Sequence, residues 1–263
     1  MTARRIDVDG TELAVHIRGR GPIALLVHGY PLDHRMWLEA LHGPLAERRT
    51  LVAVDLRGHG GSPWAGDSVH AMERFADDLV AVAKTLADEP VDVVGLSMGG
   101  YAALAMYATH SEWIRSLTLC DTKATADAAA AKAARVAAID TVLSQGRRAI
   151  ALAMTDKLLA ASADASLRAR IHTMIEDTPV ETIVADLRGL AARPDRTDLL
   201  PRIGVPTLVV VGEHDAITPI EDARVMSTAI PGARLAVLPN CGHMAPMERP
   251  QDFADELLRH WPA

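Results

Sequence analysis

Residues 91–101 read VDVVGLSMGGY, and this stretch decides the fold. It opens with a largely apolar run, which is typical of a strand buried on both faces of a parallel sheet. A Gly-x-Ser-x-Gly motif and a helical pattern follow. We therefore expect Ser97 on a sharp strand-to-helix turn, where Gly95 and Gly99 remove side chains that would collide. The Ser97 hydroxyl would then project at the C-terminal edge of the sheet, close to the first N–H groups of the helix.

Similar apolar runs recur along the chain, with helical patterns such as Met72–Leu86 and Tyr101–His110 between most of them. Strands are expected at Ile23–Val27, Leu51–Val54, Val91–Val94, Leu117–Cys120, Thr207–Val211 and Leu235–Leu238. Before them, Ile6–Val8 and Leu13–Ile17 alternate around Asp9-Gly10, which predicts an antiparallel hairpin. The pattern indicates an α/β fold with a mostly parallel eight-stranded sheet and helices on both faces.

One long segment, residues 123–200, contains no convincing strand. Helices are expected there at Ala124–Ala138, Arg147–Leu159 and Ser166–Ile175. Because an ordinary crossover needs only about a dozen residues, we interpret the segment as an inserted helical cap. The core would then comprise residues 1–122 and 201–263. The cap has no aromatic residue, so we expect an aliphatic pocket roof with Met154 and Met174 as candidates.

Composition narrows the possible partners. The 263 residues include 27 Lys and Arg against 34 Asp and Glu, a net charge of −7, and no basic block suits nucleic acid. The first residues carry charges and no apolar run approaches the roughly 18 residues of a membrane span, so neither a secretory signal nor a membrane partner is expected. Cys120 and Cys241 suggest reduced thiols in a cytoplasmic protein. The excess of Arg over Lys fits a GC-rich bacterial genome. No metal or cofactor is predicted.

A serine hydroxyl needs a base to become a good nucleophile. His243 stands just beyond the last expected strand, and Asp215 just beyond the one before it. Both therefore lie at the sheet edge where open α/β sheets place their sites, in the order Ser97, Asp215, His243. Asp121, which follows another strand, is the alternative acid. Roles outside the catalytic group are expected for Glu213 and His214, which would orient the Asp215 loop, and for His28, His34 and His59, which would be structural or line the pocket.

Acyl transfer also requires two N–H donors for the developing oxyanion. Met98, directly after the candidate nucleophile, would supply one of them. The loop after the strand at Ile23–Val27 would supply the other from Tyr30, since Pro31 has no N–H.

These motifs together resemble the α/β-hydrolase superfamily, over Ile23 to Leu258. The matching segments are HGYP at 28–31, DLRGHGGS at 55–62, GLSMG at 95–99, GEHD at 212–215, GH at 242–243 and ERP at 248–250. The chain is most similar to small bacterial esterases, 3-oxoadipate enol-lactonases and cofactor-free perhydrolases. The resemblance implies Ser97 as nucleophile, His243 as general base, Asp215 as its orienting acid, and Tyr30 and Met98 as oxyanion donors. Relatives with an Asp nucleophile are excluded by Ser97.

The expected function is therefore hydrolysis of a small to medium carboxylic ester or lactone through an acyl-enzyme. The alternatives are an enol-lactonase of the 3-oxoadipate type, a perhydrolase or C–C bond hydrolase on the same triad, and a non-catalytic ligand receptor. An enol-lactonase pocket would need cations, for which the cap offers Arg135, Arg147, Arg148, Arg168 and Arg170. Activity should decline as the pH falls through the pKa of His243, between about 6 and 7. The oligomeric state is not predicted.

Overall fold

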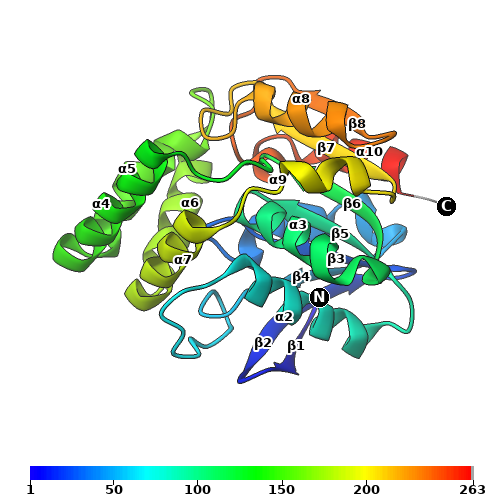
Figure 1. Ribbon diagram of the computed structural model, residues 1–263, viewed down its shortest axis with the longest axis horizontal. Coiled ribbons are helices and arrows are strands. Elements are labelled where there is room, and N and C mark those ends of the chain that lie inside the picture. Colours follow the sequence, from blue (N-terminus) through cyan, green and yellow to red (C-terminus); the bar gives the residue numbers. More distant parts are fainter. Residues whose placement is uncertain (262–263) are drawn as a thin grey trace.

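A computed structural model describes residues 1–261 and shows an eight-stranded sheet in the order β1-β2-β4-β3-β5-β6-β7-β8 (Figure 1). The strands are β1 (Thr2–Val8), β2 (Thr11–Gly19), β3 (Ile23–Val27), β4 (Thr50–Val54), β5 (Val91–Leu96), β6 (Ile114–Cys120), β7 (Thr207–Gly212) and β8 (Arg234–Leu238). Strand β2 pairs antiparallel with β1 and β4, and the remaining pairs are parallel. The predicted mostly parallel sheet with an antiparallel hairpin at its edge is confirmed.

Helices cover both faces of this sheet. On one face α2 (Met72–Leu86) packs against α3 (Met98–His110) (Figure 1). On the other face α1 (Leu38–His42) contacts α10 (Pro250–His260). Two further helices, α8 (Ile220–Ala229) and α9 (Ala245–Glu248), flank the last strands. No described helix is long and apolar enough to cross a membrane.

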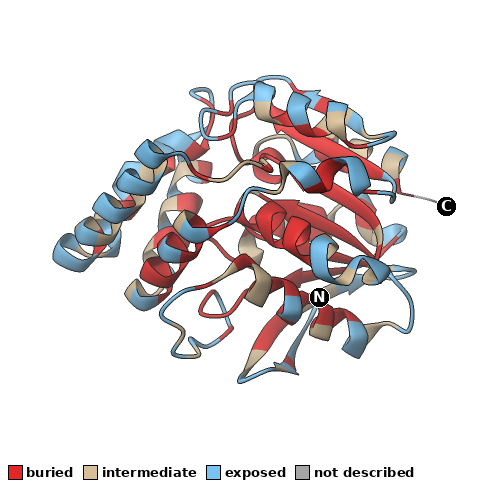
Figure 2. Ribbon diagram, in the orientation of Figure 1, coloured by how far each residue is buried: buried red, intermediate tan, exposed pale blue. Residues whose placement is uncertain are grey.

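Four helices fill most of the segment between β6 and a short 3-10 helix, η4 (Thr197–Arg202). They are α4 (Ala129–Gln145), α5 (Arg147–Leu158), α6 (Ala165–Asp177) and α7 (Val180–Ala192). Helix α4 begins five residues later than expected, and α7 was not expected, because Pro179 caps its start rather than ending a helical region. Figure 2 shows α4 and α5 largely exposed and α7 more deeply buried.

Helix α7 is attached to the core by a buried carboxylate that bridges two imidazoles. Asp186 of α7 lies 2.9 Å from Nε2 of His59 and 2.7 Å from Nδ1 of His70, and all three side chains are fully buried. Burial alone would raise the pKa of Asp186, but the two imidazoles hold this pKa below its ordinary value. The carboxylate is therefore charged at neutral pH and bridges two core side chains.

The contact between α7 and the core requires a glycine on each of its two surfaces, Gly189 on α7 and Gly58 in the core. A Cβ on Gly189 of α7 would come within 1.7 Å of the His70 carbonyl oxygen. Gly58, at φ +80°, would place a Cβ 2.3 Å from Oγ1 of Thr182, which donates a 3.0 Å hydrogen bond to the Gly58 carbonyl. The backbone at Gly58 and His70 thus packs closely on α7, against the Thr182 side chain and Gly189 respectively.

We predict that Asp186→Asn lowers the free energy of unfolding by about 3 kcal/mol, because removing one charge leaves the buried partners unmatched. Urea unfolding at neutral pH measures this difference in the free energy of unfolding. The matched control is Asp156→Asn, which removes a cap carboxylate that is 82 % exposed and paired with Arg168. It should cost less than about 0.5 kcal/mol. Equal losses in the two variants would contradict the anchoring role of Asp186.

Candidate active site

Ser97 occupies the turn between β5 and α3 with φ 53° and ψ −112°. Such a positive φ is unusual for a residue with a side chain. The neighbouring glycines make it possible: a Cβ on Gly95 would lie 2.3 Å from the Gly99 carbonyl oxygen, and one on Gly99 would lie 2.2 Å from that of Val27. The collisions expected from the motif are therefore real, and they arise against backbone that cannot move aside.

The turn is tied to the end of the neighbouring strand β6. The Ser97 N–H donates to the Cys120 carbonyl at 2.9 Å, and the Thr122 hydroxyl donates to the Ser97 carbonyl at 2.8 Å. Gly100 of α3 packs so closely on Thr122 that a Cβ there would lie 2.5 Å from its Oγ1. These contacts fix the direction of the Ser97 side chain.

His243 pairs with Asp215. Its Nδ1 lies 2.7 Å from Asp215 Oδ2, and the two residues are only 2 % and 6 % exposed. The carboxylate also accepts the N–H groups of Ile217 and Thr218 at 2.8 and 3.0 Å and the Thr218 hydroxyl at 2.7 Å. Because Nδ1 faces the carboxylate, Nε2 is the nitrogen left to accept a proton from elsewhere.

Opposing influences set the pKa of His243. Burial of the imidazole lowers the pKa, but the Asp215 carboxylate raises it by more, so the pKa lies above its ordinary value. Burial would likewise raise the pKa of Asp215, yet the His243 ring and the Thr218 hydrogen bonds bring it below its ordinary value. Asp215 is therefore anionic at neutral pH.

Asp121, the alternative acid, has other partners. Its Oδ1 accepts the Gly212 N–H at 2.8 Å, and its Oδ2 accepts the Cys120 thiol at 3.2 Å and the Ala245 N–H at 3.3 Å. Burial and the nearby Asp215 charge raise the pKa of Asp121 to about 7. The carboxylate that contacts the His243 imidazole is therefore that of Asp215. Asp121 instead links the end of β7 to the segment after His243.

The loop that carries His243 is held by Glu248 and by the cap. Glu248 Oε1 accepts the N–H groups of Gly242 at 2.9 Å and Met244 at 3.3 Å, and its Oε2 accepts that of Ala160 at 2.8 Å. The His243 N–H donates to the Leu158 carbonyl at the end of α5, at 3.0 Å. The sequence analysis did not identify Glu248 and Thr218 as groups that hold the site in place. The available signal was a hydroxyl three residues after Asp215 and a carboxylate five residues after His243.

Glu213 and His214, which were expected to orient the Asp215 loop, connect this loop to the loop that carries His243. The Glu213 carboxylate accepts the Asn240 N–H at 3.0 Å, and the His214 N–H donates to the Cys241 carbonyl at 2.7 Å.

Ser97 and His243 border one cavity of about 410 Å³, together with the two expected oxyanion donors, Tyr30 and Met98. The first bonds of α3 run from the N–H groups of Gly100 and Tyr101 to the Ser97 carbonyl. The Met98 N–H precedes them and has no acceptor within its own helix. Asp215 stands behind His243 rather than in the cavity wall.

Residues 123–200, the expected cap, contribute no aromatic side chain to the cavity wall. The apolar wall residues from this segment are Ala131, Ala134, Ala138, Ile150, Ala153, Met154, Leu158, Leu187 and Leu190. Met154 is placed as expected. The expectation for Met174 is wrong, because α6 turns this side chain toward a different cavity beside Arg35 and Leu38.

Of the five cap arginines that were candidate pocket cations for an enol-lactonase, one lines the cavity. Arg135 lines the cavity, whereas Arg147, Arg148, Arg168 and Arg170 do not. Arg168 pairs with Asp156, and Arg170 pairs with Glu39 at 2.7 Å. Both side chains lie on the helix surface, where they reach neighbouring carboxylates and do not reach the cavity.

The other histidines of this edge lie outside the cavity. His28 accepts the Leu56 N–H at 3.0 Å, and His59 belongs to the Asp186 cluster. His16 and His34 stack with ring centroids 3.3 Å apart and planes at 11°, and both contact Asp55. Among the described residues this is the group whose atoms could approach one metal ion. An imidazole binds a metal in its ring plane, so two stacked rings would have to separate first; the group is better explained as support for the Asp55 loop.

Comparisons with known proteins show which family and fold the chain is similar to. Residues 24–256 match the sequence model described as the alpha/beta hydrolase family. The chain is 32 % identical to a pimeloyl-[acyl-carrier protein] methyl ester esterase of Chromobacterium violaceum, over 95 % of this chain and 98 % of that protein. Its fold matches a thermophilic esterase from Thermogutta terrifontis with a TM-score of 0.93 and 36 % identity, covering 99 % of this chain and 100 % of the other. An enol-lactonase from Burkholderia xenovorans matches with a TM-score of 0.90 and 26 % identity, covering 98 % and 99 % of the two chains.

The pairing with Asp215 predicts the titration of His243. By NMR of histidine-labelled protein, with His243→Gln for assignment, the pKa of His243 should lie above the ordinary value of about 6.5. Asp215→Asn should lower this pKa, because the carboxylate stabilises the imidazolium. Asp140→Asn, at an exposed site on α4, should leave it unchanged. A His243 pKa that does not respond to Asp215→Asn would contradict the pairing.

Proposed function

The chain belongs to the alpha/beta hydrolase family, and on that premise we propose that it is a serine hydrolase. Its substrate is a small to medium carboxylic ester or lactone, cleaved through an acyl-enzyme on Ser97. The observation that carries the proposal is the convergence of Ser97, on its strained turn, and the Asp215–His243 pair at one cavity. The esterases and the enol-lactonase among the similar proteins support this substrate class.

In the first half-reaction, Nε2 of His243 takes the proton of the Ser97 hydroxyl while Oγ attacks the carbonyl carbon. The N–H groups of Tyr30 and Met98 hold the carbonyl oxygen as it becomes an oxyanion. Asp215 keeps the Nδ1 proton in place and stabilises the imidazolium. The tetrahedral intermediate then expels the alcohol, which takes its proton from His243.

In the second half-reaction, His243 takes a proton from water, and the resulting hydroxide attacks the acyl carbon. The oxyanion occupies the same two donors, and collapse of the intermediate returns Ser97 as leaving group with the proton held by His243. One water is consumed, and a carboxylic acid is released. A lactone follows the same steps, except that its alcohol remains attached to the acid.

The size of the cavity fits this substrate class. About 410 Å³ is near the lower end of the range for small-molecule sites. We further propose a core of residues 1–122 and 201–263 with a cap at 123–200, because three of the four helices in that segment, α4, α5 and α7, line the cavity while the sheet supplies the reactive groups. A cytoplasmic location is supported by the two buried, unpaired thiols of Cys120 and Cys241.

Ser97→Ala should lower kcat for 4-nitrophenyl butyrate by about 10⁴-fold or more, because no other group forms the acyl-enzyme. Release of 4-nitrophenolate measures it. Ser144→Ala, at an exposed serine of α4, should retain full turnover. The assignment is wrong if Ser97→Ala keeps more than about a tenth of the wild-type rate.

The pH dependence should follow His243. Only the neutral imidazole accepts the serine proton, so kcat/KM should fall about tenfold per pH unit below the pKa of His243. Since Asp215 raises this pKa, the fall should begin above about pH 6.5. Initial rates from about pH 5 to about pH 9 test this, with circular dichroism to show that the protein stays folded. A profile that is flat down to about pH 5.5 would exclude His243 as the base.

A further inference from the structure

The charge of the active-site cavity is opposite to that of the whole chain. The protein carries a net charge of −7, yet the charged groups of the cavity wall, His243 aside, are Lys123, Arg135 and Lys157 against the single carboxylate of Asp127. In a cavity with low-dielectric walls, such an excess attracts ligands of the opposite sign.

Asp127 is already neutralised by arginines. Arg135 Nε lies 2.6 Å and Arg193 Nη1 lies 2.8 Å from its two oxygens. Asp127 is buried, and these two partners hold its pKa below the ordinary value although burial opposes this. Arg135 is thus engaged with Asp127, and the two lysines carry the remaining positive charge of the wall.

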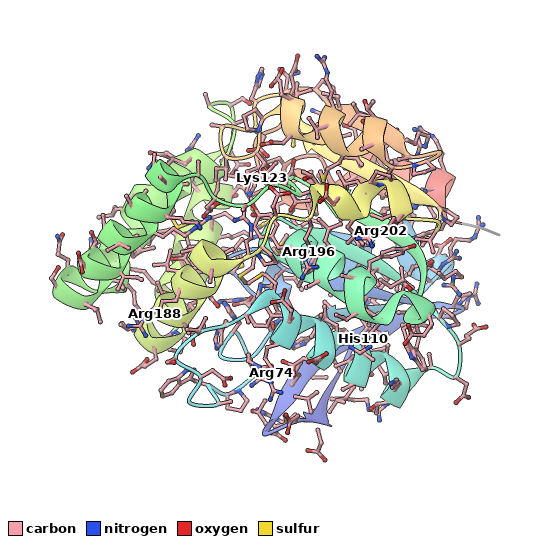
Figure 3. All side chains as sticks on the ribbon, in the orientation of Figure 1. Arg74, His110, Lys123, Arg188, Arg196 and Arg202 are labelled. Atoms are coloured by element: carbon pink, nitrogen blue, oxygen red, sulfur yellow. The ribbon has the colours of Figure 1, made fainter. Side chains whose placement is uncertain are left out.

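Neither lysine ammonium has a hydrogen bond or an ion pair within residues 1–261. Lys123 is half-buried where the chain leaves β6 for the cap, as Figure 3 shows, and directly follows the Thr122 that binds the Ser97 carbonyl. Lys157 precedes Leu158, whose carbonyl holds the His243 N–H. The two ammonium groups are therefore carried by the segments that position Ser97 and His243.

These lysines differ from two arginines of the cap. Arg168 and Arg170 each pair with a carboxylate away from the cavity. The chain has only four lysines, and two of them line this cavity. The Tyr30 hydroxyl on the same wall is buried without a hydrogen-bond partner among the described residues, so a polar ligand group has a further contact available there.

We propose that the substrate is an anionic ester, carrying a carboxylate on the arm that lies in the cavity, and that Lys123 and Lys157 select it. This inference rests on the proposed ester hydrolysis at Ser97. The lysines are binding groups and take no part in the proton transfers. Their ammonium groups pair with the substrate carboxylate, while the alanine and leucine wall contacts the chain between that carboxylate and the scissile carbonyl.

Two matched pairs of substrates test the proposal. For the acyl arm, mono-4-nitrophenyl adipate is compared with 4-nitrophenyl hexanoate, since they have the same chain length and differ in a terminal carboxylate. For the alcohol arm, 4-acetoxybenzoate is compared with its methyl ester. The readout is the ratio of kcat/KM for the anionic ester to that for the neutral ester, corrected for spontaneous hydrolysis.

Lys123→Gln and Lys157→Gln should each lower this ratio by about tenfold in at least one pair, because each removes one charged partner of the carboxylate. The corresponding Arg variants should restore most of it. Lys132→Gln is the matched control, since Lys132 is, like Lys157, an exposed lysine of the cap but lies outside the cavity, and it should leave the ratio unchanged. Melting temperatures show whether any variant has lost its fold.

The outcomes separate this inference from the proposed function. If the wild type hydrolyses the neutral esters but the ratios stay the same in Lys123→Gln and in Lys157→Gln, the lysines do not select an anion and the inference is overturned. If neither anionic nor neutral esters are turned over, the proposed ester hydrolysis itself fails. A ratio that falls equally in Lys132→Gln would assign the effect to the general charge of the cap, which also overturns the inference.

Discussion

The active-site architecture depends on a close approach of backbone at the centre of the sheet. Gly99, at the start of α3, lies against the Val27 carbonyl of β3, and Gly95 of β5 lies against Gly99, with no room for a Cβ at either position. This approach forces Ser97 into its positive φ and points it out of the sheet edge. A methyl group at either glycine would separate strand from helix and displace the serine from the other groups of the cavity.

A second close approach joins the loop of the histidine to the end of β7. Gly212 and Gly242 meet so closely that a Cβ on Gly212 would lie 1.9 Å from the Gly242 carbonyl oxygen. From there Glu248 and the His243 N–H reach the end of α5. The cap therefore does more than cover the cavity: it supplies hydrogen bonds to the loop of the proposed base, and on its other side α7 is anchored to the core by Asp186.

Local patterns predicted much of this arrangement, and pairing in three dimensions explains what they missed. The inner strands were found because burial on two faces leaves a continuous apolar run, although β6 starts earlier than expected because Arg115 interrupts the run and is neutralised by Asp92 at 2.7 Å. The roles of Met174 and the cap arginines could not be predicted, since they depend on how each helix is rotated. Likewise, the sequence contains four lysines, but only the fold shows that two of them face the cavity and have no partner within residues 1–261.

The central claim is that Ser97 forms the covalent intermediate, with His243 as its base. Labelling with a fluorophosphonate probe, followed by peptide mass spectrometry, tests it most directly, because the probe bonds to an activated serine whatever the natural substrate is. The account predicts one phosphonylated site, Ser97, with labelling abolished by Ser97→Ala and strongly slowed by His243→Ala. Labelling of another serine at the same rate, or of none in the folded wild-type protein, would contradict it.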